Sequence, residues 1–174
     1  MHLKLFNILA ILALSVVPAS AEISLENQKL IATGIPTYEN RQFIARIKKD
    51  LRLNVPVIVL LGPYDKKMGS ARLVDGFPRN YYILVDKDFY RGLSDLEKRS
   101  LIGHELGHVV FAVKPKAGDS EFVSLQIGAD LFAARYVGFD AMIALLNKLY
   151  PTDTSKEIPE YVLRIGILKK LQAQ

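Results

Sequence analysis

The sequence predicts an α+β fold in which a small, mostly antiparallel sheet packs against helices. Residues 55–61 form a continuous aliphatic run closed by Gly62-Pro63, which is typical of a buried strand. Two shorter strands are expected at residues 71–74 and 81–85, separated by turn-forming residues. Residues 100–113 carry apolar side chains on almost every side of a helix. We therefore expect that helix to be buried at the centre of the fold.

The first 21 residues have the pattern of a secretory signal peptide. Lys4 precedes an apolar run over residues 5–17, and the segment ends in Ala19-Ser20-Ala21, an A-x-A-type cleavage site. The apolar run is short for a bilayer span, and an uncleaved anchor is the alternative. We expect cleavage before Glu22 and export to the periplasm or the medium.

Residues 22–174 are expected to form one domain, because about 150 residues can bury one core. Removing Lys4 leaves 22 cations against 18 anions, so the net charge falls from +5 to +4. The basic residues are scattered, without the aromatic and basic stripe of a nucleic-acid surface, and we expect no nucleic-acid partner. The chain has no cysteine and hence no disulfide. Composition leaves oligomeric state and peripheral contact with a membrane open.

Three further helices are expected on either side of the central one. Residues 40–51 place Phe43, Ile44, Ile47 and Leu51 at helical spacing, with cations between them. Residues 140–149 form a short amphipathic helix closed by Pro151, and a last helix opens at Pro159. These helices look like structural support for the central one.

The central helix has clear start and stop signals. Ser94-Asp95-Leu96-Glu97 is a capping box, which begins a helix, and Lys114-Pro115 ends one. Between them lies His104-Glu105-Leu106-Gly107-His108. Residues four apart share a helix face, so both imidazoles can reach one metal ion. Glu105 then lies beside that ion, where it can act as general base on a water acidified by zinc. The alternative is a pair of hydrogen-bonded core histidines beside a surface-facing Glu105.

A third zinc ligand has to be an oxygen donor, because residues 22–174 contain only these two histidines. Residues 120–137 form a second helix that ends at Gly138. On it Gln126 and Asp130 share a face, whereas Glu121 lies on another side. Gln126 and Asp130 are therefore the candidates. A salt bridge from Asp130 to Arg135, or to another surface cation, is the structural alternative.

The segments Leu101-Ile102-Gly103-His104-Glu105-Leu106-Gly107-His108 and Ala129-Asp130-Leu131-Phe132-Ala133-Ala134 resemble the gluzincin metallopeptidases of the HtpX and CAAX-prenyl-endopeptidase type. The resemblance covers roughly residues 70–168. It implies a zincin-like fold with the H-E-x-x-H helix central. It also implies a second helix with the pattern E-x-x-A-D, whose glutamate binds zinc and whose aspartate supports a ligand histidine.

This chain departs from that pattern in having Gln126 where the family has its ligand glutamate. A neutral amide is a poorer zinc ligand than a carboxylate. Three outcomes stay open: Asp130 binds zinc itself, Gln126 binds weakly with Asp130 behind it, or catalysis is lost. The resemblance also places an arginine near the site, for which Arg164 is the candidate, although a surface cation is the simpler expectation. Tyr136 and Tyr161 are candidates for the oxyanion donor.

The function expected from these residues is that of a secreted or periplasmic zinc metalloendopeptidase acting on polypeptides. His104, His108 and Asp130, or Gln126 in its place, would hold Zn²⁺, and Glu105 would be catalytic. Zinc peptidases often hold substrate as a strand added to a sheet edge, and Tyr82 in segment 81–85 is the candidate substrate contact, with an inner strand as the alternative. The rival is a catalytically impaired pseudopeptidase that acts as a binding or quality-control module on envelope proteins.

Overall fold

The computed structural model describes residues 25–64, 71–76, 80–111, 120–150 and 159–174. Its element order is α2 (Leu25–Thr33), β1 (Ile35–Thr37), α3 (Arg41–Asp50), β2 (Val57–Gly62), β3 (Ala71–Gly76), β4 (Asn80–Asp86), α4 (Lys87–Arg91), α5 (Asp95–Phe111), α6 (Ser120–Val137), α7 (Phe139–Leu149) and α9 (Pro159–Gln172). The protein is therefore α+β, as predicted. The expected signal segment, residues 1–21, lies outside the described residues.

The sheet has four strands in the order β1-β2-β4-β3. The two outer pairs, β1 with β2 and β3 with β4, are antiparallel, whereas β2 and β4 in the middle are parallel. The expectation of a mostly antiparallel sheet thus holds for the outer pairs only. Strands β3 and β4 follow each other in the chain and pair with each other, and the other side of β4 pairs with β2. This arrangement makes β4 an inner strand.

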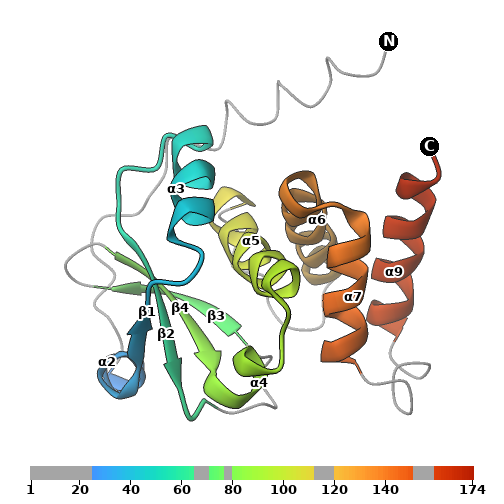
Figure 1. The fold of residues 1–174 in the computed structure, drawn as a ribbon. Helices are drawn as coiled ribbons and strands as arrows, with labels where there is room; N and C mark the ends of the chain where they lie inside the picture. Colours follow the sequence, from blue (N-terminus) through green and yellow to red (C-terminus); the bar gives the residue numbers. More distant parts are fainter. Residues whose placement is uncertain (1–24, 65–70, 77–79, 112–119, 151–158) are drawn as a thin grey trace.

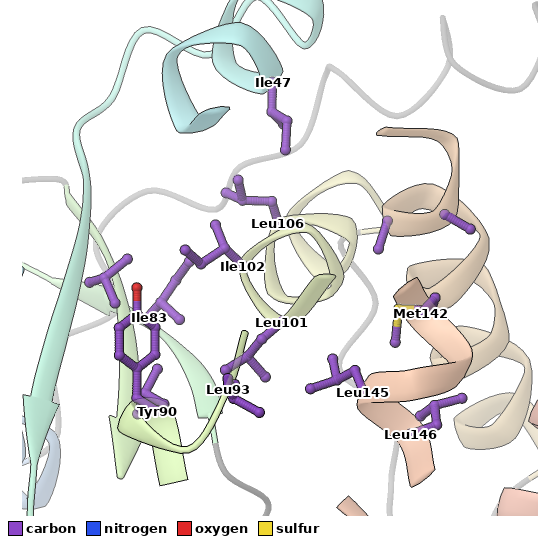
Figure 2. Packing of buried hydrophobic residues seen from close by; sticks show 14 of the residues in the cluster. Ile47, Ile83, Tyr90, Leu93, Leu101, Ile102, Leu106, Met142, Leu145 and Leu146 are labelled. Carbon is purple, nitrogen blue, oxygen red and sulfur yellow. The ribbon is translucent and has the colours of Figure 1, made fainter. Parts of the chain in front are cut away.

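Helix α5 lies between the sheet and helices α6, α7 and α9 (Figure 1). It packs against α6 and α7 on one side and against α3 and β3 on the other. Figure 2 shows Ile102 turned toward Ile83 of β4, and Leu106 turned toward Ile47 of α3. All four side chains are fully buried in the main core. The central position predicted for this helix is confirmed.

The start of α5 is fixed by the capping box that the sequence predicted. The Ser94 N–H donates to Glu97 Oε2 at 2.7 Å, and the Glu97 N–H donates to Ser94 Oγ at 3.4 Å. Lys148 of α7 also donates to Glu97 Oε2 at 2.7 Å. Because one carboxylate caps α5 and binds α7, the two helices are tied at this end.

A second, smaller core lies on the other face of the sheet. Leu60 and Leu84 are buried there beneath Leu30 and Ile31 of α2. Helix α2, strand β1 and the short helix α4 were not anticipated from the sequence. None of the helices in the described part of the chain is long and apolar enough to cross a membrane.

Candidate metal centre

Small residues bring α5 and α6 close together beside the H-E-x-x-H motif. A Cβ added to Gly107 would lie 2.8 Å from Ala129 Cα, and one added to Gly103 would lie 3.2 Å from Ala133 Cβ. Two such pairs, one helical turn apart, let the two backbones approach more closely than larger side chains would allow. Asp130 directly follows Ala129, so the close crossing places its carboxylate against α5.

The two histidines of α5 point at each other through the nitrogens that could bind a metal. His108 Nε2 lies 3.1 Å from His104 Nε2, and the ring planes are nearly perpendicular, at 89°. Two nitrogens that bind one zinc ion at about 2.0–2.1 Å in tetrahedral geometry are separated by about 3.3 Å. The observed pair therefore needs little movement to hold one ion. The spacing equally fits a hydrogen bond between the two rings.

Asp130 lies behind His104 and fixes the orientation of its ring. Asp130 Oδ1 is 2.8 Å from His104 Nδ1. An ionised carboxylate only accepts hydrogen bonds, so Nδ1 carries the ring proton and its N–H donates a hydrogen bond to Asp130. The lone pair of neutral His104 is then on Nε2, which faces His108. A carboxylate behind a ligand histidine is a common way to orient the ring and increase its basicity.

Arg164 of α9 holds Asp130 from the other side. Its Nε donates to Asp130 Oδ2 at 2.7 Å and its Nη2 donates to Asp130 Oδ1 at 2.8 Å. The two residues are 1% and 3% exposed, so this is a buried, bidentate ion pair. Nη1 of Arg164 donates to Glu160 Oε1 at 2.9 Å. Both oxygens of Asp130 therefore accept hydrogen bonds, from His104 of α5 and from Arg164 of α9.

The charges of the site follow from burial and from these contacts. Burial opposes ionisation of Asp130, but the hydrogen bonds from Arg164 and His104 outweigh it, and its pKa lies below the usual value. Burial lowers the pKa of His108 to about 4; the interactions with His104 and Arg164 add to this effect, and Asp130 opposes it. His108 is therefore neutral near pH 7, as a metal ligand has to be.

Glu105 is buried beside this pair rather than turned to the surface. Its residue is 6% exposed. Burial raises its pKa, and the interactions with His104 and Arg164 reduce that effect. A carboxylate with a raised pKa is a better proton acceptor, because the bound proton is held more firmly. The surface-facing Glu105 of the structural alternative is wrong, although the hydrogen-bonded histidine pair of that alternative fits the geometry.

No third protein ligand is evident among the residues that the structure describes. Within the described ranges there is no group of three or more His, Cys, Asp or Glu side chains that could hold a metal ion. Gln126 is half-buried on α6, one turn before Asp130, on the side that faces α5. The residues present therefore fit a metal held by two histidines, with Gln126 as the nearest candidate oxygen donor by its position.

Tyr82 does not belong to this site. Its strand, β4, is paired on both sides, so the expected edge-strand role is wrong. Successive side chains of a strand alternate between faces, and Tyr82 packs with Leu60 and Leu84 on the α2 side, whereas Ile83 faces the α5 side. The sequence could not reveal this, because β4 also pairs in parallel with β2, a strand that is not its neighbour along the chain.

Neither tyrosine considered as an oxyanion donor reaches the histidines. Tyr136 packs edge-on against Phe43 of α3. Tyr161 donates to Asn147 of α7. Arg135 is likewise not the partner of Asp130; Arg164 is.

The expectation that Arg164 is a surface cation is wrong, and the sequence did carry a signal for its burial. Arg164 lies three residues after Tyr161 and four before Leu168, on the inward stripe of α9. A cation on the apolar stripe of a helix is buried and needs an anion as its partner. Asp130, on the inward face of α6, needed a cation in the same way.

Comparison with known proteins gives no further assignment. No family model matches the chain, and no curated protein or solved structure matches it at a significant level.

Proposed function

We propose that this protein is a zinc-dependent metalloendopeptidase with a zincin-like site. The observation that carries the proposal is the convergence of His104 Nε2 and His108 Nε2 at 3.1 Å, with Asp130 holding the opposite nitrogen of His104. Glu105 is next to them in the same buried environment. If the two histidines had only a structural role, nothing would require Glu105, which lies between them in the sequence, to be buried as well.

Within this proposal, a bound zinc ion would supply an acidified water and polarise the peptide carbonyl. His104 and His108 would hold the ion, and Asp130 would keep the lone pair of His104 turned toward it. Glu105 accepts a proton from the attacking water. It then passes that proton to the amine of the cleaved peptide bond, which leaves as a neutral group. The raised pKa of Glu105 suits both steps.

The contacts of Asp130 favour a supporting role over direct zinc binding. Direct coordination would require Asp130 to release Arg164 or His104, and Arg164 would then be a buried cation whose remaining carboxylate partner is Glu160. Gln126 is the candidate for the third ligand. This is the arrangement that the resemblance to the HtpX-type gluzincins implies, with a neutral amide in place of a carboxylate.

We expect a polypeptide substrate, held as an added strand along β3. This strand is an outer strand of the sheet and packs against α5, which carries the motif. Main-chain pairing of this kind tolerates many sequences. The pattern at residues 1–21 supports export to the periplasm or the medium.

The second candidate is a pseudopeptidase that binds envelope proteins without cleaving them. It is favoured by the engagement of both Asp130 oxygens and by the neutral side chain of Gln126, which together leave the site without a carboxylate ligand. A zinc ion held by neutral ligands alone is bound more weakly.

Zinc content and cleavage of unfolded casein, measured on the same preparations, separate these functions. The wild type is compared with Glu105→Gln, His104→Ala and the control Glu26→Gln, which alters an exposed carboxylate on α2. If the protein is a peptidase, wild type, Glu105→Gln and Glu26→Gln each bind about one zinc ion, and only wild type and Glu26→Gln cleave casein. Zinc without cleavage in the wild type supports the pseudopeptidase. Wild type that binds no zinc after incubation with the metal overturns both zinc-based roles.

A further inference from the structure

A hollow of about 470 Å³ lies where α3 meets β1 and the start of β2. Its floor is apolar and includes Ile44 of α3 with Val57 and Ile58 of β2. Strand β1 is at the opposite edge of the sheet from β3, and none of the candidate metal-site residues lines the hollow. Figure 1 shows α3 above the β1 and β2 strands at this side of the molecule. The hollow is therefore separate from the histidine site.

An exposed aromatic ring stands beside this floor. Tyr38 lines the hollow and is 78% exposed, and Ile35 on the adjoining strand β1 is 63% exposed. Tyrosine combines a large apolar ring with a hydroxyl group, and for that reason it is enriched at protein interfaces. An apolar floor flanked by such a ring can take up one or two apolar side chains of a partner.

The side chains that line the hollow include two cations and one carboxylate. Arg41 and Lys48 line it, and neither has an ion-pair partner within the parts of the chain that the structure covers. Glu39 is the one carboxylate of the lining, and it pairs with Lys98 at 2.8 Å. Helix α3 also exposes Lys49 and Asp50, neither of which lines the hollow, and Arg46, which lies over the ring of Tyr136. Charge complementarity therefore favours an anionic partner.

Strand addition is not the way such a partner would bind here. The middle residue of the three-residue strand β1 is Pro36, which has no N–H group to donate. Proline on a short outer strand is a common means of blocking further strand pairing. Recognition would depend on side chains: carboxylates against Arg41 and Lys48, and apolar groups against the floor.

We propose that this hollow is a docking site for a short acidic segment of another polypeptide, in which carboxylates alternate with apolar side chains. The site acts by binding alone and does not depend on a metal. It is thus an interaction surface additional to the proposed peptidase site.

The test is fluorescence anisotropy with two labelled octapeptides of alternating charged and apolar residues, one with glutamate and leucine, the other with lysine and leucine. Binding is measured for the full chain, for the double variant Arg41→Glu/Lys48→Glu, and for Lys169→Glu/Lys170→Glu. The last variant makes the same change of net charge on exposed residues of α9, far along the chain from the hollow. His104→Ala is included to separate docking from the metal site, and circular dichroism checks that each variant is folded.

The proposal expects saturable binding of the glutamate peptide, weakened about tenfold by Arg41→Glu/Lys48→Glu and changed less than about twofold by Lys169→Glu/Lys170→Glu. The variant Arg41→Glu/Lys48→Glu should instead prefer the lysine peptide. His104→Ala should bind the glutamate peptide as tightly as wild type does. Equal loss in both double variants would mean non-specific attraction and overturn the proposal. Vesicles of phosphatidylcholine and phosphatidylglycerol that bind through Arg41 and Lys48, with no binding of the peptide, would overturn it in favour of a lipid surface.

Discussion

Replacing Asp130 by asparagine tests whether this residue supports His104 or binds zinc. The substitution keeps the shape of the side chain and removes its charge. Arg164 is 3% exposed and would retain Glu160, whose side chain is 22% exposed, as its ion-pair partner. Removing one member of a buried ion pair costs about 3–5 kcal/mol. Because Glu160 still offers partial compensation, we expect Asp130→Asn to lower the free energy of unfolding by about 3 kcal/mol.

The same variant should weaken zinc binding without abolishing it. The lost hydrogen bond to His104 Nδ1 loosens the orientation of the ring, and losses of this kind reduce metal affinity by about 10–100-fold. Urea unfolding of chelator-treated protein measures the stability, and competition with a chromophoric chelator measures the zinc dissociation constant. The two readouts are independent, so a protein that binds no zinc still tests the ion pair.

A double-mutant cycle with Arg164→Gln provides the control. The double variant removes the unpaired cation, so its stability loss should be smaller than the sum of the two single losses by about 2 kcal/mol. If one of the single variants does not fold, the stability of the double variant can still be measured. Complete loss of zinc in Asp130→Asn, with metal-free stability within about 0.5 kcal/mol of wild type, would identify Asp130 as a direct ligand and refute the supporting role.

Two further predictions concern the packing and capping of the helices. Gly107→Ala should destabilise the protein by about 1–3 kcal/mol in urea unfolding, because the new methyl group would lie 2.8 Å from the Ala129 backbone. Gly166→Ala, whose Cβ would meet nothing within 4 Å, is the matched control and should raise stability by about 0.5–1 kcal/mol; similar effects at both positions would contradict the close helix crossing. Burial opposes ionisation of Glu97, but hydrogen bonds from Lys148 and Ser94 outweigh it and lower its pKa. A carboxyl group whose pKa is lower in the folded state stabilises the fold above its unfolded-state pKa, and this stabilisation is lost as the pH falls through the folded-state pKa. Glu97→Gln should therefore lower the free energy of unfolding by about 1 kcal/mol at pH 7. That difference should shrink below about pH 4.5, and a cost that stays constant down to pH 3 would argue against the ionised cap.

Features that depend on neighbouring residues could be predicted from the sequence. The bounds of α6 are those expected, residues 120–137, because Gly138 adopts a φ of +90° that ends the helix. The capping box at Ser94 and Glu97 likewise acts within one turn. The spacing of four residues between His104 and His108 determined that both side chains lie on the same face of α5. In each case the signal and the structure it specifies lie within a few residues of each other.

Tertiary structure decided the features that join distant segments. Parallel pairing of β2 with β4, on the side of β4 away from β3, placed Tyr82 on an inner strand, because strand order depends on hydrogen bonds between segments and not on the residues of one strand. Packing of α9 against α6 buried Arg164 and gave Asp130 a partner 34 residues away. The sequence by itself thus determined which side chains could form a metal site. Only the packing of α5, α6 and α9 decided that Asp130 supports His104 and is held by Arg164, because a buried charge takes whichever partner the fold brings within hydrogen-bond distance.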